Sequence, residues 1–138
     1  MKAALACVAL ITLITACATQ PPEPTSRRLT GDTFDDVPAP ESAVFRSGAG
    51  ESFAFQSSGF RCGRFVFDYP GADTEAIRFF KETMQRPPYS WKLTNEQREV
   101  EGSTRLTLVK GGDTCTVNVD RVPARESVVL TLRVNYRK

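Results

Sequence analysis

Histidine is absent from this sequence of 138 residues, and tryptophan occurs only once, at position 91. Without histidine the chain lacks the commonest general base and the commonest metal ligand of proteins. Catalytic Ser–His and Cys–His pairs are therefore excluded. The GxSxG, P-loop and GxGxxG motifs are also missing from the sequence. We accordingly predict that the protein is not an enzyme and that it uses neither a metal nor a cofactor.

Pairs of carboxylates are the remaining route to catalysis, and acids cluster at two places. Asp35 and Asp36 lie in a proline-rich stretch, and the polar segment NEQREVEG contains Glu96, Glu99 and Glu101. Acid pairs that hydrolyse glycosides face each other across a gap of about 5–10 Å. Nothing in the sequence specifies such a cleft, so both groups are expected on the solvated surface.

Excess charge is also small, because 18 Lys and Arg residues stand against 16 Asp and Glu residues. The basic residues are dispersed and form no run of the kind that binds nucleic acid, so nucleic acid is not expected as a partner. Arginine outnumbers lysine. This excess has two interpretations. It reflects genomic base composition, or the guanidinium groups recognise carboxylates or phosphates.

Cysteine is scarce, with residues only at positions 7, 17, 62 and 115. Structural zinc sites usually need four ligands in close pairs, which this spacing does not provide. Cys115 lies on the apolar side of an alternating segment, whereas strict alternation places Cys62 on the opposite, wet side. A bulge at Gly63 would bring Cys62 inward. A disulfide between Cys62 and Cys115 in an oxidising compartment and two separate thiols are both consistent with the sequence.

The N-terminus, MKAALACVALITLITA, has one lysine followed by an apolar stretch. This stretch is shorter than the roughly 20 residues that span a bilayer, and it has the length of a secretory signal core. Ile14-Thr15-Ala16-Cys17 resembles the lipobox of bacterial lipoproteins, in which an aliphatic residue and two small ones precede a cysteine. The resemblance implies that the signal peptide, residues 1–16, is removed and that Cys17 is acylated by diacylglyceryl and fatty acyl chains such as palmitate. An ordinary secretory signal or a buried N-terminal helix is the alternative.

The acylated end implies a position in the cell. Two or three acyl chains hold a protein firmly on a membrane, since each buried methylene contributes about 0.8 kcal/mol. In lipoproteins of Gram-negative bacteria, Asp after the acylated cysteine commonly retains the protein at the inner membrane. Ala18 stands there in this chain. The resemblance therefore implies an outer-membrane lipoprotein whose domain faces the periplasm.

Residues 17–42 are expected to form the lipidated cysteine and a proline-rich tether. The stretch contains five prolines, at positions 21, 22, 24, 38 and 40. Prolines at this density favour extended polyproline conformation over packing. Such a tether would reach roughly 75 Å if fully extended.

A folded domain, residues 43–138, is expected after the tether, and we expect it to fold alone. Apolar and polar residues alternate in several segments, as in strands with one buried face. The expected strands are residues 52–56, 61–69, 89–94, 104–110, 115–120 and 128–136. Between the second and the third, residues 73–86 carry Ile77, Phe80 and Met84 at helical spacing. Asp73 is expected to cap this helix, and Pro87-Pro88 ends it.

The expected element order is β-β-α-β-β-β-β. One buried and one solvated face per strand indicate an antiparallel sheet. We therefore predict an α+β fold, a two-layer sandwich with one helix on one face of the sheet. Trp91 is expected to pack beneath Phe80 or Met84, and an exposed ligand-stacking ring is the alternative. The polar face, with Arg133 and Asn135 opposite Thr116, Asn118 and Asp120, is the candidate binding surface.

Several short motifs also resemble a group of small bacterial envelope lipoproteins of unknown function. The group has a valine-proline start, a strand ending in Tyr and Gly, a helix with Phe and Met, and a Gly-Trp pair. Here VPAP, Tyr69-Pro70-Gly71, Phe80 to Met84 and Ser90-Trp91 stand in those places, with serine replacing the glycine. The resemblance implies a lipoprotein of the envelope and carries no catalytic residues.

Two functions are consistent with these features. The first is a lipid-anchored envelope protein whose non-catalytic domain binds or scaffolds an envelope protein or the cell wall. The second is a lipoprotein inhibitor of an attacking hydrolase such as a lysozyme. Known small lipoprotein inhibitors of this kind are mainly β-barrels, whereas this chain is expected to contain a central helix.

Overall fold

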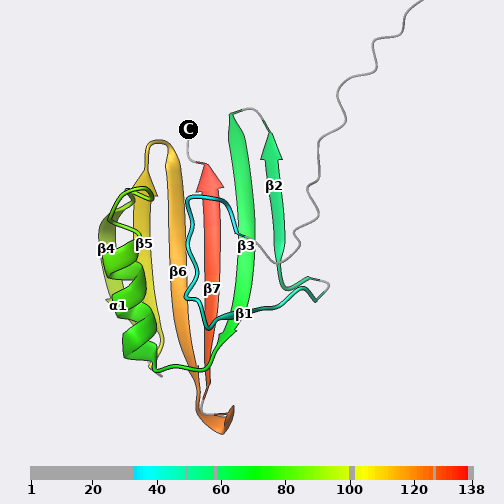
Figure 1. The fold of residues 1–138 in the computed structure, drawn as a ribbon, viewed down its shortest axis with the longest axis vertical. Helices are drawn as coiled ribbons and strands as arrows, with labels where there is room; N and C mark the ends of the chain where they lie inside the picture. The colour runs from blue at the N-terminus through cyan, green and yellow to red at the C-terminus, as the bar shows by residue number, and fades with distance from the viewer. Residues whose placement is uncertain (1–32, 49, 58, 100–101, 126, 137–138) are drawn as a thin grey trace, which may run out of the picture.

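The computed structural model describes residues 33–48, 50–57, 59–99, 102–125 and 127–136. These residues form seven strands and one α-helix, which confirms the predicted class of an antiparallel sheet with one helix (Figure 1). The elements are β1 (Val44–Phe45), β2 (Phe53–Ser57), β3 (Phe60–Tyr69), α1 (Asp73–Thr83), β4 (Lys92–Arg98), β5 (Thr104–Lys110), β6 (Asp113–Val122), a 3-10 helix (Pro123–Arg125) and β7 (Ser127–Tyr136). The short strand β1 was not predicted.

All strand pairs are antiparallel, and the strand order is β1-β3-β7-β6-β5-β4, with β2 also paired to β3. The register places one row of apolar side chains across four strands. Phe65 of β3 pairs with Leu132 of β7, Leu132 pairs with Val117 of β6, and Val117 pairs with Leu106 of β5. All four are fully buried. We call the side of the sheet that carries this row the inner face and the opposite side the outer face.

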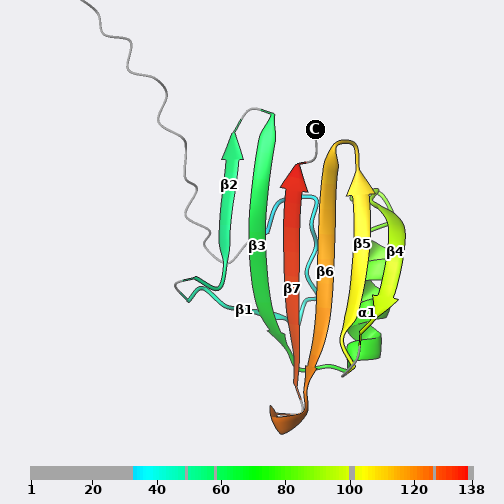
Figure 2. The ribbon, with the colours of Figure 1, turned by 180° about the vertical axis from the view of Figure 1, so that it is seen from behind.

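The inner face is covered by two segments. Helix α1 lies over the β4–β5 side, and residues 33–43, which we call the N-terminal strap, cross in front of the strands between β3 and β6 (Figure 1). Figure 2 shows the outer face from behind, where no helix or connecting segment of the described residues crosses it. The described part of the chain is therefore layered on one side of the sheet only.

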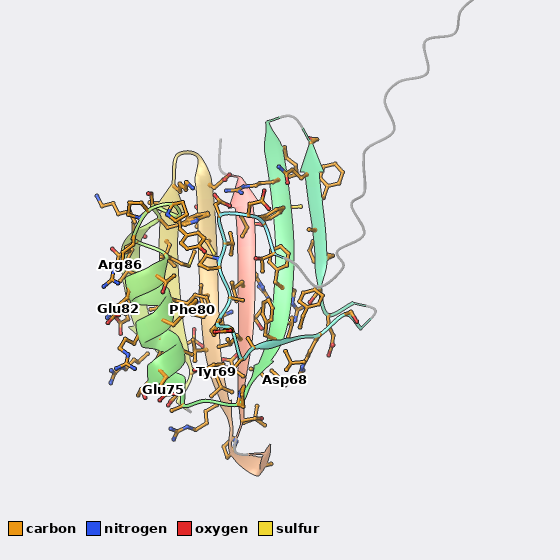
Figure 3. All side chains as sticks on the ribbon, in the orientation of Figure 1. Asp68, Tyr69, Glu75, Phe80, Glu82 and Arg86 are labelled. Carbon is orange, nitrogen blue, oxygen red and sulfur yellow. The ribbon has the colours of Figure 1, made fainter. Side chains whose placement is uncertain are left out.

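Helix α1 buries two of the three residues of the predicted apolar stripe. Phe80 and Met84, which follows the last helical residue, are fully buried in the common core, and Phe80 points from the helix toward the sheet (Figure 3). Ile77 is only partly buried, and Ala76, which was not part of the predicted stripe, is fully buried beside it. Asp73 is the first helical residue, and Ala72 occupies the N-cap position that we predicted for Asp73. A carboxylate in the first turn still lies favourably near the positive end of the helix dipole. The helix ends at Thr83, earlier than predicted.

The N-terminal strap contradicts the expected boundary at residue 43. Val37 is fully buried, and Phe34 is 8% exposed and meets Phe65 edge-on, with ring centroids 5.3 Å apart. The folded domain therefore includes residues from Thr33 onward, and residues 17–32 of the expected tether lie outside the described residues. The prolines of this stretch indicated an extended chain, but burial of two isolated apolar side chains fixes it against the sheet.

Strand β4 also differs from its prediction. It begins three residues later than expected and runs through Asn95 to Arg98, which we interpreted as a polar turn. As an edge strand, β4 carries polar side chains on both faces and lacks the alternation that reveals half-buried strands. Its register shifts between Leu93 and Asn95.

Within the described ranges, no helix has the length and apolar character needed to cross a membrane.

Candidate functional site

The outer face is built from alternate residues of the long central strands. Side chains of β3, β6 and β7 point alternately to the two faces, so the residues between the buried apolar ones share the outer face. Arg133 and Asn135 of β7 are exposed there, as predicted. Thr116 of β6 lies directly opposite Arg133 in the register, and Thr114 lies opposite Asn135. These residues form the polar centre of the candidate site.

Arg64 of β3 lies directly opposite Arg133 on the same face. Two like charges directly opposite each other on neighbouring strands destabilise a sheet unless something compensates for them. The outer-face positions next to this pair in the register carry no acid: they are Phe53, Cys62, Val66, Thr116, Thr131 and Asn135. The Arg64–Arg133 pair therefore forms a small positive surface.

Arg64 has a second unusual feature. Its Nε atom is buried and has no hydrogen-bond partner within the described part of the chain. A buried donor left unpaired costs about 1–3 kcal/mol of stability. An acceptor group bound at this pair would compensate for the adjacent positive charges.

Aromatic side chains flank the arginine pair at the β2–β3 hairpin. Phe53 and Phe60 are 54% and 44% exposed, and the Phe55 and Phe60 ring centroids lie 6.0 Å apart. All three belong to the outer face by register. We call Phe53, Phe55 and Phe60 the aromatic edge.

The two cysteines of the domain lie on opposite faces of the sheet. Cys115 pairs with Val134 and is fully buried on the inner face, whereas Cys62 pairs with Asn135 on the outer face. Both thiols are free. The β3 register runs without interruption through Gly63, so the bulge that would turn Cys62 inward is absent there. The disulfide interpretation is therefore wrong, because the sheet separates the two sulfur atoms.

Burial also sets the chemistry of these thiols. Burial raises the pKa of the Cys115 thiol to about 12, because the charged thiolate is poorly solvated in the core. Cys115 is consequently an unreactive core residue. Cys17, the predicted site of lipidation, lies outside the described residues.

Trp91 is a core residue and is not a ligand-stacking ring. It is 2% exposed in the same cluster as Phe80 and Met84, which confirms the predicted packing. Its backbone N–H donates to Met84 O at 2.8 Å, and its Nε1 donates to Asp36 O at 2.6 Å. The indole therefore connects the strap to the core. Because its ring is buried, Trp91 is no longer a candidate binding residue.

Asp36 of the strap anchors a cluster of charged side chains at one end of the inner face. Arg61 Nη1 and Lys110 Nζ donate to its carboxylate at 2.6 and 3.0 Å, and Arg61 also pairs with Asp113. The Arg61 guanidinium lies 5.1 Å from the centre of the Phe34 ring, a cation–π contact. The cluster therefore joins the strap to β3, β5 and β6.

The protonation of Asp36 follows from these contacts. Burial alone would raise the pKa of its carboxyl, but hydrogen bonds from Arg61 and Lys110 outweigh burial and hold that pKa below its usual range. The expectation that Asp35 and Asp36 are both solvated is wrong for Asp36, whose side chain is only 21% exposed. Asp35 is exposed.

The second acid group lies on the surface, as predicted for two of its three members. Glu96 pairs with Lys81 at 2.5 Å, and Glu99 pairs with Arg105 at 2.8 Å. Glu101 lies outside the described residues. In the described part of the chain, no three acidic, cysteine or histidine side chains gather in a way that could hold a metal ion.

Comparison of the chain with protein-family models, with curated proteins and with solved structures finds no match. The resemblance to small envelope lipoproteins therefore stays a prediction.

Sequence reasoning placed Arg133 and Asn135 on the outer face but did not single out Arg64 or the aromatic edge as candidates. Alternation along β3 did place Arg64 on the same side as Cys62, away from Phe65 and Phe67. The sequence did not reveal that β3 and β7 are neighbours, although they are far apart in the chain. Only that pairing brings the two arginines together.

Proposed function

We propose that this protein is a lipid-anchored protein of the bacterial cell envelope whose folded domain binds a partner without catalysis. The lipobox-like sequence ending in Cys17 supports the anchor. Ala18 supports the outer membrane, with the domain facing the periplasm. The outer face of the sheet supports binding, because among the described residues neither helix α1 nor the N-terminal strap crosses it.

The Arg64–Arg133 pair is the observation that carries the binding proposal. Guanidinium groups recognise carboxylates and phosphates through two parallel hydrogen bonds, and such charge-assisted bonds are stronger than neutral ones. Two adjacent guanidinium groups without an acidic neighbour favour an anionic group of the partner. Carboxylates occur both on acidic protein segments and in cell-wall peptides, so a protein of an envelope assembly or the cell wall is the proposed partner.

Affinity capture from crosslinked cells tests the binding proposal. We expect the full-length protein to retain one dominant partner and the variants Arg64→Ser and Arg133→Ser to lose it. Arg86→Ser is the matched control, because Arg86 is exposed beyond the end of α1 on the covered side (Figure 3). Equal capture of the partner by all three variants would show that the arginine pair does not bind it.

The identity of the captured partner distinguishes a binding or scaffolding protein of the envelope from an inhibitor of an attacking hydrolase. An envelope protein or cell-wall fragment supports the proposal, whereas a secreted hydrolase would assign the protein to the inhibitors.

The anchor is tested separately with Cys17→Ser. This variant should remain uncut, or should be released as a soluble form. If it is cut and still fractionates with the membrane, the lipid anchor is refuted.

A further inference from the structure

The sheet ends in two edges, β4 on one side and, on the other, β2 together with the two-residue strand β1, which also pairs with β3. The strands β4 and β2 differ in protection. Natural proteins protect edge strands with charged residues and bulges, which discourage pairing with another chain. Strand β4 contains Lys92, Glu96 and Arg98, and its register shifts between Leu93 and Asn95. Edge β4 is thus protected in both ways.

Strand β2 has neither kind of protection. Its sequence, FAFQS, contains no charge, proline or glycine, and its register with β3 is continuous from Phe53 to Ser57. Among the described residues, β2 pairs with β3 alone, and no backbone hydrogen bond from a turn or loop reaches it. No described residue therefore occupies the backbone groups along its free edge.

The side chains beside this edge include exposed aromatic rings, whose burial by another chain would be favourable. The aromatic edge lies on β2 and the start of β3, where Phe53 is 54% and Phe60 is 44% exposed. Another strand added to β2 would extend the sheet beside these rings and remove apolar area from water. Burial of apolar area is the main favourable term in protein association.

We propose that β2 pairs with β2 of a second copy of this chain, in an antiparallel arrangement with its two-fold axis at Phe55. This register pairs all five residues of each strand: Phe53 with Ser57, Ala54 with Gln56 and Phe55 with Phe55. Residues opposite each other in an antiparallel pair share a face, so Phe53 and Phe55 of both copies form one continuous aromatic strip. Because β2 is uncharged, the two-fold axis brings no like charges together.

The pairing is independent of the Arg64–Arg133 site and of its partner. One pair of five-residue strands is a small interface, and small interfaces give weak, transient association. Confinement of both copies to one membrane by the proposed lipid anchor raises their effective concentration and compensates for this weakness.

Disulfide trapping in membranes tests the pairing in the full-length chain. The variant Phe55→Cys, in a Cys62→Ser background, places one reactive thiol at the two-fold axis. Opposite residues of antiparallel strands have Cα atoms about 4.5–5.5 Å apart, within the range that a disulfide bridges. We expect a covalent dimer on mild oxidation. Val44→Cys in the same background is the matched control, because Val44 is an outer-face residue that is even more exposed, at 63%, and lies outside β2.

The unchanged chain gives a further control. Cys62 pairs with Phe55 on β3, so two copies of Cys62 would lie three strand spacings apart, about 14 Å. That distance is too long for a disulfide, and the unchanged chain should not crosslink through Cys62. Crosslinking of Val44→Cys as fast as Phe55→Cys would overturn the proposal, as would capture of a different protein by Phe55→Cys.

A charge exchange provides a second, independent readout. Two differently tagged copies should co-purify as wild type and should separate when both carry Phe55→Lys, because two lysines then face each other. A copy with Phe55→Lys and a copy with Phe55→Glu should co-purify again, a rescue that a merely unfolded variant would not show. Co-purification of two Phe55→Lys copies, or failure of the mixed pair, contradicts the register. Arg133→Ser should leave association unchanged even where it abolishes partner capture.

Discussion

At the scale of single residues, Trp91 connects the strap to the core through both its ring and its Nε1–H. Truncation to Ala should cost about 3–5 kcal/mol, as for other large buried aromatic residues. Trp91→Phe should cost less, about 1–2 kcal/mol, because it mainly leaves the Asp36 carbonyl without its donor. Denaturant unfolding of the two variants measures these losses. The sole tryptophan should also emit blue-shifted fluorescence and resist acrylamide, and red emission from the folded domain would contradict its burial.

The two free thiols of the domain provide a second prediction at this scale. Cys62 is partly exposed on the outer face, whereas Cys115 is fully buried with its pKa raised to about 12 by burial. The reactive species is the thiolate, so a thiol reagent should label Cys62 in the native protein and Cys115 only after unfolding. Mass spectrometry of labelled peptides measures this. Cys62→Ser is the control, and labelling of that variant in its native state would contradict the assigned faces.

At the scale of elements, the strap is the least expected part of the fold. Burial of a Val or a Phe side chain contributes about 1.5–3 kcal/mol each. A chain that starts at Ala43 lacks both Phe34 and Val37 and should lose roughly 3–6 kcal/mol, a large share of the 5–15 kcal/mol of a typical domain. A chain that starts at Thr33 is the control. Equal melting temperatures for the two chains would show that the strap adds no stability.

The charged cluster that holds the strap should make the free energy of unfolding depend on pH in the acidic range. The pKa of Asp36 is lowered in the folded state, so the ionised carboxylate contributes stability at any pH above its unfolded pKa of about 3.9. That contribution is lost as the pH falls through the lower folded pKa. Asp36→Asn should cost about 1–3 kcal/mol at pH 7 and should flatten the loss of stability below about pH 4. Asp35→Asn, at the exposed neighbour, should change stability by less than about 0.5 kcal/mol.

The elements also differ in how far the sequence predicts them. Strand β5 has its predicted bounds, and β3 and β7 differ from theirs by only one residue at the start, because apolar and polar residues alternate throughout these strands. Strand β4 was misplaced, since an edge strand that is polar on both faces has no such pattern. The strap was missed because Phe34 and Val37 are isolated among prolines, and only the distant strand β3 gives Phe34 its partner.

At the scale of the whole molecule, the domain has a covered face and an uncovered one. The helix and the strap bury the apolar side of the sheet, and the polar residues opposite it follow from the same alternation. Arg133 and Asn135 could therefore be placed on the outer face from the sequence. Their neighbour Arg64 required the pairing of β3 with β7, which no local pattern encodes.

Photo-crosslinking in living cells is the most direct test of the proposal that the outer face binds the partner. A photoreactive amino acid is introduced at Asn135 on the outer face in one strain and at Glu82 in another. Glu82 is exposed on α1, on the opposite side of the molecule (Figure 3). Binding through the outer face predicts a discrete crosslinked partner from position 135 and none from position 82. A partner crosslinked from position 82 alone, or equally from both positions, would contradict it.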